Sequence, residues 1–162
     1  PPIREKYHQD ELWNGILDGT IDCIATDHAP HTLDEKSQPY GLTPAGMPGV
    51  ETSLALMLNQ VTNKRIQIEQ VVKWMCENPA IVYKIKNKGF LKEGFDADIT
   101  LIDMNKEKII SGKNMQSKCG WSAFDGTNIK GWPVTTIVNG NIVYENEQIN
   151  SQFLGLPVLF NE

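Results

Sequence analysis

The chain has 162 residues, of which 40% are hydrophobic and 22% charged, so its composition is that of a globular protein rather than a disordered segment. Its 15 basic and 20 acidic residues give a net charge of -5, and no Lys/Arg cluster indicates a nucleic-acid surface. Apolar runs such as residues 54–58 are too short to cross a bilayer, and the 3 widely spaced cysteines are typical of reduced thiols. We therefore expect a soluble cytoplasmic protein that binds neither nucleic acid nor membrane.

The first part of the chain predicts a helix followed by a buried strand. Apolar residues at three- and four-residue spacings predict a helix over residues 6–18, and Gly19 is placed to end it. The short apolar run 21–25 predicts a strand that stops abruptly at polar residues, among them Asp27 and His28. This is the pattern of one unit of a parallel α/β fold, in which the chemistry lies at the carboxyl ends of the strands.

A long loop and two more helices follow. Residues 32–49 are rich in Gly and Pro, and a connection of this length is typical of a lid or a substrate-binding loop. Apolar stripes predict helices over about 50–63 and 68–77. The second helix should end before Asn78-Pro79, because the residue before a proline is pushed away from helical geometry.

The last part of the chain favours strands. Residues 97–103 read as one strand and 108–111 as another, and 135–144 contain two β-branched runs around Asn139-Gly140. That dipeptide predicts a hairpin, because a type I′ turn needs positive φ at both central residues.

We place a domain boundary near residue 88. Residues 1–88 would form a unit of helices with a barrel-type strand, and residues 89–162 a small β-rich unit. The chain starts with Pro1-Pro2 and no initiator methionine, so we expect it to be part of a longer polypeptide.

Asp27 and the histidines beside it are the strongest candidates for chemistry. A carboxylate at the mouth of a buried strand suits a metal ligand or a general base, whereas the alternative is that Asp27 caps the next turn. His31 would reach the same mouth, or could be a loop histidine facing water. We expect His28 to be structural, with its ring in supporting hydrogen bonds.

Five segments resemble the dihydroorotases of the amidohydrolase superfamily, in the same order along the chain. Residues 24–32 (Ile-Ala-Thr-Asp-His-Ala-Pro-His-Thr) resemble the signature that closes that family's barrel. Residues 1–4 match the part of its Asn-Pro-Pro-hydrophobic-Arg motif that comes after the asparagine, and residues 89–98 resemble the superfamily's entry into its small β domain. Residues 119–122 and 131–134 fit the family's C-terminal region.

The resemblance implies an α/β fold: the C-terminal segment of a (β/α)₈ TIM barrel followed by part of a small β-sandwich-like domain. It implies reversible cyclisation of N-carbamoyl-L-aspartate to dihydroorotate, a step of pyrimidine biosynthesis, by a metal-bound hydroxide. Asp27 would be a ligand of a binuclear Zn²⁺ centre and also the catalytic proton shuttle. His31 would contact the substrate's carboxylate. Ala45 and Gly46 would present backbone groups to the pyrimidine ring, although Gly46 could also be a plain turn glycine and Glu51 a first-turn acid of the next helix.

The same resemblance places most of the metal ligands, including a His-x-His pair, before residue 1. We therefore expect these 162 residues alone to bind metal poorly and to show no hydrolase activity. Three alternatives stay open: another cyclic amidohydrolase (dihydropyrimidinase, hydantoinase or allantoinase), a non-catalytic dihydroorotase-like partner of aspartate carbamoyltransferase, and a free-standing α/β binding module. A homodimer and an association with aspartate carbamoyltransferase also stay open.

Overall fold

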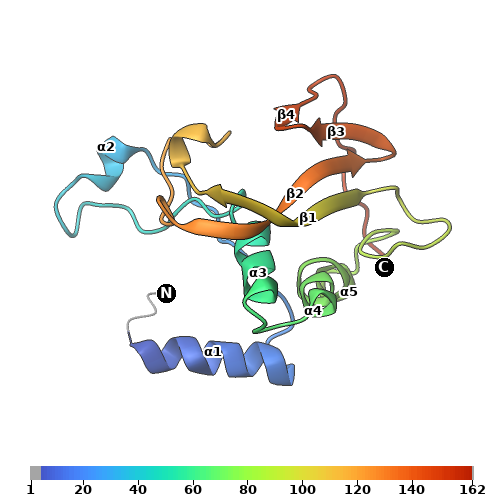
Figure 1. Ribbon diagram of the computed structural model, residues 1–162, viewed down its shortest axis with the longest axis horizontal. Helices are drawn as coiled ribbons and strands as arrows, with labels where there is room; N and C mark the ends of the chain where they lie inside the picture. Colours follow the sequence, from blue (N-terminus) through green and yellow to red (C-terminus); the bar gives the residue numbers. More distant parts are fainter. Residues whose placement is uncertain (1–4, 162) are drawn as a thin grey trace.

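The computed structural model describes residues 5–161 and combines helices with an antiparallel sheet (Figure 1). The helical elements are α1 (Lys6–Asp18), α2 (Leu33–Lys36), α3 (Ser53–Thr62), α4 (Ile68–Val72), the π-helix η1 (Lys73–Glu77), α5 (Asn78–Val82) and the 3₁₀ turn η2 (Gly112–Asn114). The strands are β1 (Ile99–Ile109), β2 (Asn128–Val138), β3 (Asn141–Glu145) and β4 (Gln148–Ile149). Within residues 5–161, no helix is both long enough and apolar enough to span a membrane.

Helix α1 confirms the prediction from spacing, and it ends at Gly19 with φ 87°, a left-handed conformation that glycine adopts without a Cβ penalty. Helix α3 begins at Ser53 rather than near residue 50. The carbonyl of Gly49 accepts hydrogen bonds from the Thr52 and Ser53 amides, so a turn occupies the expected first turn of the helix.

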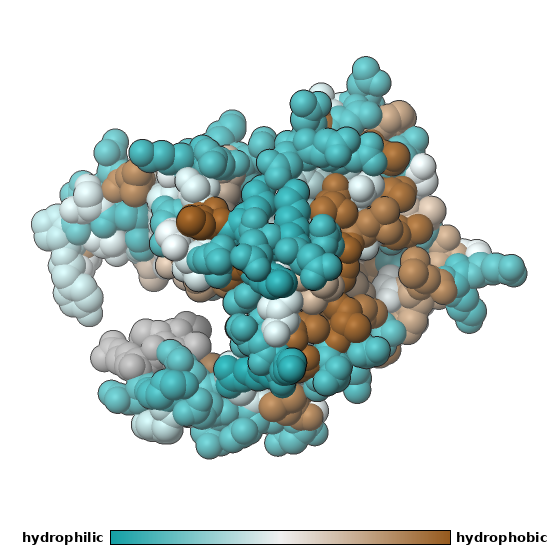
Figure 2. All heavy atoms as spheres, in the orientation of Figure 1, coloured by the Kyte–Doolittle hydropathy of each residue, from teal (hydrophilic) through white to brown (hydrophobic). Residues whose placement is uncertain are grey.

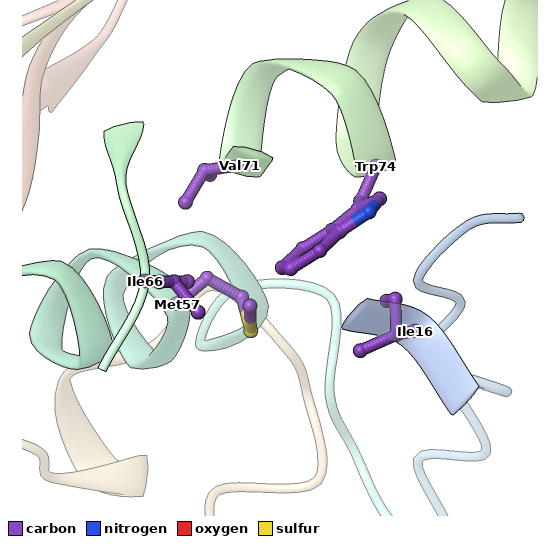
Figure 3. Packing of buried hydrophobic residues seen from close by; sticks show 5 residues of the cluster. All are labelled: Ile16, Met57, Ile66, Val71 and Trp74. Atoms are coloured by element: carbon purple, nitrogen blue, oxygen red, sulfur yellow. The ribbon is translucent and has the colours of Figure 1, made fainter. Parts of the chain in front are cut away.

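Helix α3 lies between the other helices and the sheet. On one side Met57 packs with Ile16 of α1 and Trp74 of η1, and Figure 3 shows these side chains pointing toward one another. On the other side Ala55 packs with Ile110 and Ile129 of the β unit. One helix thus joins two apolar clusters, which fixes the β unit relative to the helices.

The expected helix end before Pro79 is wrong. Asn78 has helical angles (φ -61°, ψ -44°), and the chain runs from α4 through η1 directly into α5. Pro79 stands in the first turn of α5, directly after the π-helix, and the helical path continues past it.

The run 21–25 is extended but does not form a strand of a sheet among residues 5–161. A parallel strand needs a hydrogen-bonded neighbour. This run is held instead by bonds to the helices: the Ile21 amide donates to the Gly15 carbonyl (2.8 Å), the Ile24 amide donates to the Trp74 carbonyl (3.1 Å), and the Asn78 side chain donates to the Asp22 carbonyl.

The sheet is antiparallel in the order β1-β2-β3-β4. The two strands expected at 97–103 and 108–111 are one strand, β1, which is irregular between Asp103 and Glu107. The hairpin at Asn139 and Gly140 is confirmed, with φ 48° and 79° at the two residues. Strand β4 was not expected from the sequence.

Apolar side chains remain exposed on the side of the molecule that carries α4, α5 and the end of the chain (Figure 2). The C-terminal segment lies beside α5, because the Lys86 amide bonds the Leu159 carbonyl and the Asn161 amide bonds the Lys84 carbonyl.

Candidate functional site

Asp27 ends the extended run with an unusual backbone. Its φ is 44°, a left-handed conformation that Asp and Asn tolerate better than other non-glycine residues and that is often found at functional sites. The residue is exposed, and among residues 5–161 no hydrogen bond to its carboxylate is found, so it does not cap the following turn. The structure therefore presents Asp27 with a free carboxylate at the end of the run.

His28 joins this run to the long loop. Its Nδ1 accepts hydrogen bonds from the amides of Gly49 (3.1 Å) and Val50 (3.3 Å). The next amide, that of Ala29, donates to the Met47 carbonyl at 3.0 Å. The ring therefore holds backbone, in agreement with the structural role expected for it.

His31 is half-buried, and its Nδ1 lies 3.8 Å from a carboxylate oxygen of Glu35. The amide of Thr32, and then its hydroxyl, donates to the Glu35 carboxylate and holds the pKa of Glu35 below its usual value. The Thr32 hydroxyl also accepts from the Glu35 amide (3.3 Å), and this bond forms a capping box for the short helix α2 together with the bond from the Thr32 amide. The backbone of His31 is held separately, since its carbonyl accepts a hydrogen bond of 2.7 Å from the Trp121 indole.

Ala45 and Gly46 are both exposed, on the loop that His28 ties to the run. Gly46 has φ 103°, and a Cβ atom there would lie 2.5 Å from the Cβ of Ala29. Glycine is required at this point because the loop approaches the chain just after Asp27. Asp27 and Gly46 thus lie on two segments that are in direct contact at Ala29.

Glu51 is not the first-turn acid that was considered for it. It precedes α3, and its two carboxylate oxygens accept hydrogen bonds from the backbone amides of Gln116 (2.8 Å) and Ser117 (2.7 Å). The β unit is therefore bonded to the end of the long loop.

Lys36 and Trp121 contact the loop in ways that the sequence did not reveal. The Nζ of Lys36 donates to the carbonyls of Pro44 (2.9 Å) and Gly46 (3.0 Å). A signal was present for Lys36, because it is the only Lys or Arg between Lys6 and Lys64. Trp121 lies in the segment 119–122 that resembles the family, but nothing in the sequence indicates its acceptor, since the bond spans 90 positions of the chain.

The described residues do not fit a zinc site by themselves. Within residues 5–161, no three His, Cys, Asp or Glu side chains lie close enough together to hold a metal ion. Asp27 could supply one ligand, but the His28 Nδ1 is occupied by backbone amides, and a zinc site takes at least three protein ligands.

Known proteins with similar sequences and structures cover nearly the whole chain. Dihydroorotases of Endomicrobium trichonymphae and Pyrococcus horikoshii are 43% and 41% identical over 146 and 149 residues. The solved L-hydantoinase (dihydropyrimidinase) of Arthrobacter aurescens is 33% identical with a TM-score of 0.85 over 93% of this chain, and the D-hydantoinase (dihydropyrimidinase) of Thermus sp. is 27% identical with a TM-score of 0.86.

The matches cover only part of the relatives. The chain spans 35% and 34% of the two dihydroorotases and 34% of each of the two solved hydantoinases, about a third of their length. The model of the amidohydrolase family matches residues 5–143. The chain therefore belongs to the amidohydrolase family.

Proposed function

We propose that the full-length protein containing this chain is a dihydroorotase, which interconverts N-carbamoyl-L-aspartate and dihydroorotate in pyrimidine biosynthesis. The observation that carries the proposal is the segment from Asp27 to His31. Its left-handed aspartate presents an exposed carboxylate, and the loop of Ala45 and Gly46 is folded against it. The curated dihydroorotases also match at higher identity than the solved hydantoinases do.

The run 21–25 and its helices are proposed as the closing segment of a (β/α)₈ barrel, and the sheet as part of a sandwich-like domain. The likeness in fold to the hydantoinases supports this, as do the exposed apolar side chains, which further chain would cover. We propose a cytoplasmic location and a requirement for zinc. Homodimer formation and binding to aspartate carbamoyltransferase are further proposals that an oligomeric-state measurement would address.

In this proposal Asp27 is one metal ligand, and the remaining ligands lie outside the described residues. During hydrolysis its carboxylate takes a proton from the water that attacks the ring carbonyl and passes it to the ring nitrogen as the C–N bond breaks, and on cyclisation the same transfers run in reverse. His31 donates to the substrate's free carboxylate. The backbone of Ala45 and Gly46 hydrogen-bonds the ring, and the close approach of Ala29, which leaves no room for a side chain at position 46, holds this backbone in place.

A second candidate is a hydantoinase or dihydropyrimidinase, because the solved structures similar to this chain carry those names. Their substrates' rings need no partner for a carboxylate, so His31 distinguishes the two candidates. A non-catalytic partner of aspartate carbamoyltransferase predicts no turnover of any of these substrates.

The test is an assay of the full-length protein on dihydroorotate, dihydrouracil, hydantoin and allantoin. We expect turnover of dihydroorotate, its loss by about a hundredfold or more in Asp27→Asn, and normal activity in the control Asp34→Asn, an exposed position on α2. Preference for another ring, or full activity of Asp27→Asn, would reject the proposal. Residues 1–162 alone should be inactive.

A further inference from the structure

The loop that faces Asp27 depends on two side chains outside the proposed catalytic set. We infer that Lys36 and Trp121 are positioning residues, which hold this loop and the His31 backbone in the shape that receives the substrate. The inference rests on the proposed function for the identity of the substrate. It concerns residues that the proposed reaction does not itself use.

Lys36 holds the two carbonyls that flank Ala45. Its Nζ donates to the carbonyls of Pro44 and Gly46 from a half-buried position, and together these bonds fix the peptide units 44–45 and 46–47, on either side of the Ala45–Gly46 peptide. A charged donor makes stronger hydrogen bonds than a neutral one. Because the ammonium is directed at backbone oxygens, its role is to order the loop.

Trp121 holds the other side of the site from the β unit. Its indole N–H donates to the His31 carbonyl at 2.7 Å, while its ring lies 5.8 Å from the Lys36 Nζ. The loop that carries Trp121 is itself secured, because the carboxylate of Glu51 binds the amides of Gln116 and Ser117.

Trp121 is also fixed from behind by Gly112. A Cβ atom at position 112 would lie 2.3 Å from the Trp121 Cα, so these two backbones are in closest approach. The backbone of Trp121 is therefore packed against Gly112 on one side, and its indole bonds the His31 carbonyl on the other. The β unit thereby contributes to the order of the site without touching the substrate.

The chain supplies a matched pair of controls. Trp132 also donates its indole N–H to a backbone carbonyl, that of Ile129 at 2.9 Å, and Lys108 lies 5.3 Å from the Trp132 ring. This second pair also places a lysine near an indole that donates to backbone, but it belongs to the sheet, and its lysine donates to the Glu147 carboxylate rather than to a loop carbonyl.

The experiment compares Lys36→Met and Trp121→Phe with Lys108→Met and Trp132→Phe in the full-length protein. We expect Lys36→Met to raise KM for dihydroorotate about tenfold and to change kcat less than about threefold, because ordered loop backbone contributes to binding. Trp121→Phe keeps the ring and loses only the donor, so KM should rise about threefold. The controls should leave KM within about twofold.

Hydrogen exchange of the amides in residues 41–50 provides the second readout, and we expect it to accelerate in Lys36→Met but not in Lys108→Met. The inference stands if KM and exchange change together. An unchanged KM, or equal changes in the controls, would overturn it. A raised KM with unchanged exchange would also overturn it, because Lys36 would then act on the substrate directly. If Lys36→Met does not fold, Trp121→Phe carries the test.

The two proposals can fail separately. If the full-length protein turns over dihydrouracil, hydantoin or allantoin instead, the proposed substrate is wrong, and the same comparison of KM and exchange is made with the substrate that is used. The positioning roles then stand or fall on that comparison alone.

Discussion

The β2–β3 hairpin and the loop of residues 28–50 keep their shapes in different ways. In the hairpin the backbone bonds itself, with residues paired from Thr135↔Glu145 to Val138↔Asn141. In the loop, side chains bond the backbone, chiefly His28 and Lys36. The stability of the hairpin is shared by many backbone hydrogen bonds, whereas the shape of the loop depends on the bonds of a few side chains. Substitutions in the sheet and its packing should therefore alter global stability, and substitutions in the loop should alter the site.

The largest global effect should come from the contact between α3 and the sheet. Leu58 is 0% exposed and packs where Gly131 lets the backbone of β2 approach. Leu58→Ala should reduce the free energy of unfolding of the full-length protein by about 2–5 kcal/mol, because it leaves a cavity in a packed core. The measurement is the midpoint of denaturant unfolding. Leu42→Ala, at an exposed loop position, is the control, and equal shifts in the two variants would contradict the prediction.

Gly46→Ala should show the opposite behaviour. The new Cβ would meet the Ala29 Cβ at 2.5 Å in a left-handed backbone, so the loop must shift at a cost of about 1–3 kcal/mol. Because the loop moves away from Asp27, the relative rise in KM should be larger than the relative fall in the unfolding midpoint. Gly41→Ala is the control for backbone strain alone, since its φ is 94° and no atom lies within 4 Å of the added carbon. The prediction fails if both variants change KM equally.

His28→Ala should release the end of the same loop. The amides of Gly49 and Val50 lose their acceptor, at a cost of about 1–3 kcal/mol, because Gly49 is buried and its amide is left without a partner. Hydrogen exchange at these two amides should accelerate. In His28→Asn the side-chain oxygen replaces Nδ1 and should restore protection, whereas fast exchange in both variants would mean that the loop needs the whole ring.

The sequence predicted elements whose cause is local. Helix α1 and its glycine end follow from spacing, and the hairpin follows from Asn139-Gly140, because the residues that decide these features are neighbours. Strand β4 was missed because its turn, at Asn146 and Glu147, also uses positive φ (51° and 65°) but contains no glycine. The path through Pro79 was missed because the π-helix η1 precedes it, and the formation of such a widened turn depends on how the segment packs.

In the candidate site, too, the residues that could be predicted are neighbours in the sequence, and those that were missed bond distant parts of the chain. Asp27 and His31 could be singled out because they are close in the sequence and stand after an apolar run. The bonds of Lys36 span 8 and 10 positions and that of Trp121 spans 90, so only the folded chain identifies their acceptors. The role first considered for Glu51 was wrong for the same reason, since its partners are 65 and 66 positions away.

The smallest effect should come from Glu147 at the edge of the sheet. Hydrogen bonds from Lys108 and then Lys106 lower the pKa of this carboxyl from its usual 4.5 to about 2. A carboxyl with a lowered pKa in the folded state stabilises the fold above its usual pKa, and this contribution is lost as the pH falls from about 4.5 to about 2. Glu147→Gln should therefore lower the Tm slightly at pH 7, and the difference from the parent should vanish near pH 2.

The decrease should be small because Glu147 is solvent-exposed, and about 1 M salt should reduce it further by screening the charges. Glu145→Gln, at an exposed position two residues earlier with no ion pair among residues 5–161, is the matched control. If the two variants follow the same Tm profile against pH, the lysines do not stabilise this edge. A difference confined to Glu147→Gln would instead show that side-chain ion pairs also stabilise the sheet, in addition to the backbone hydrogen bonds between its strands.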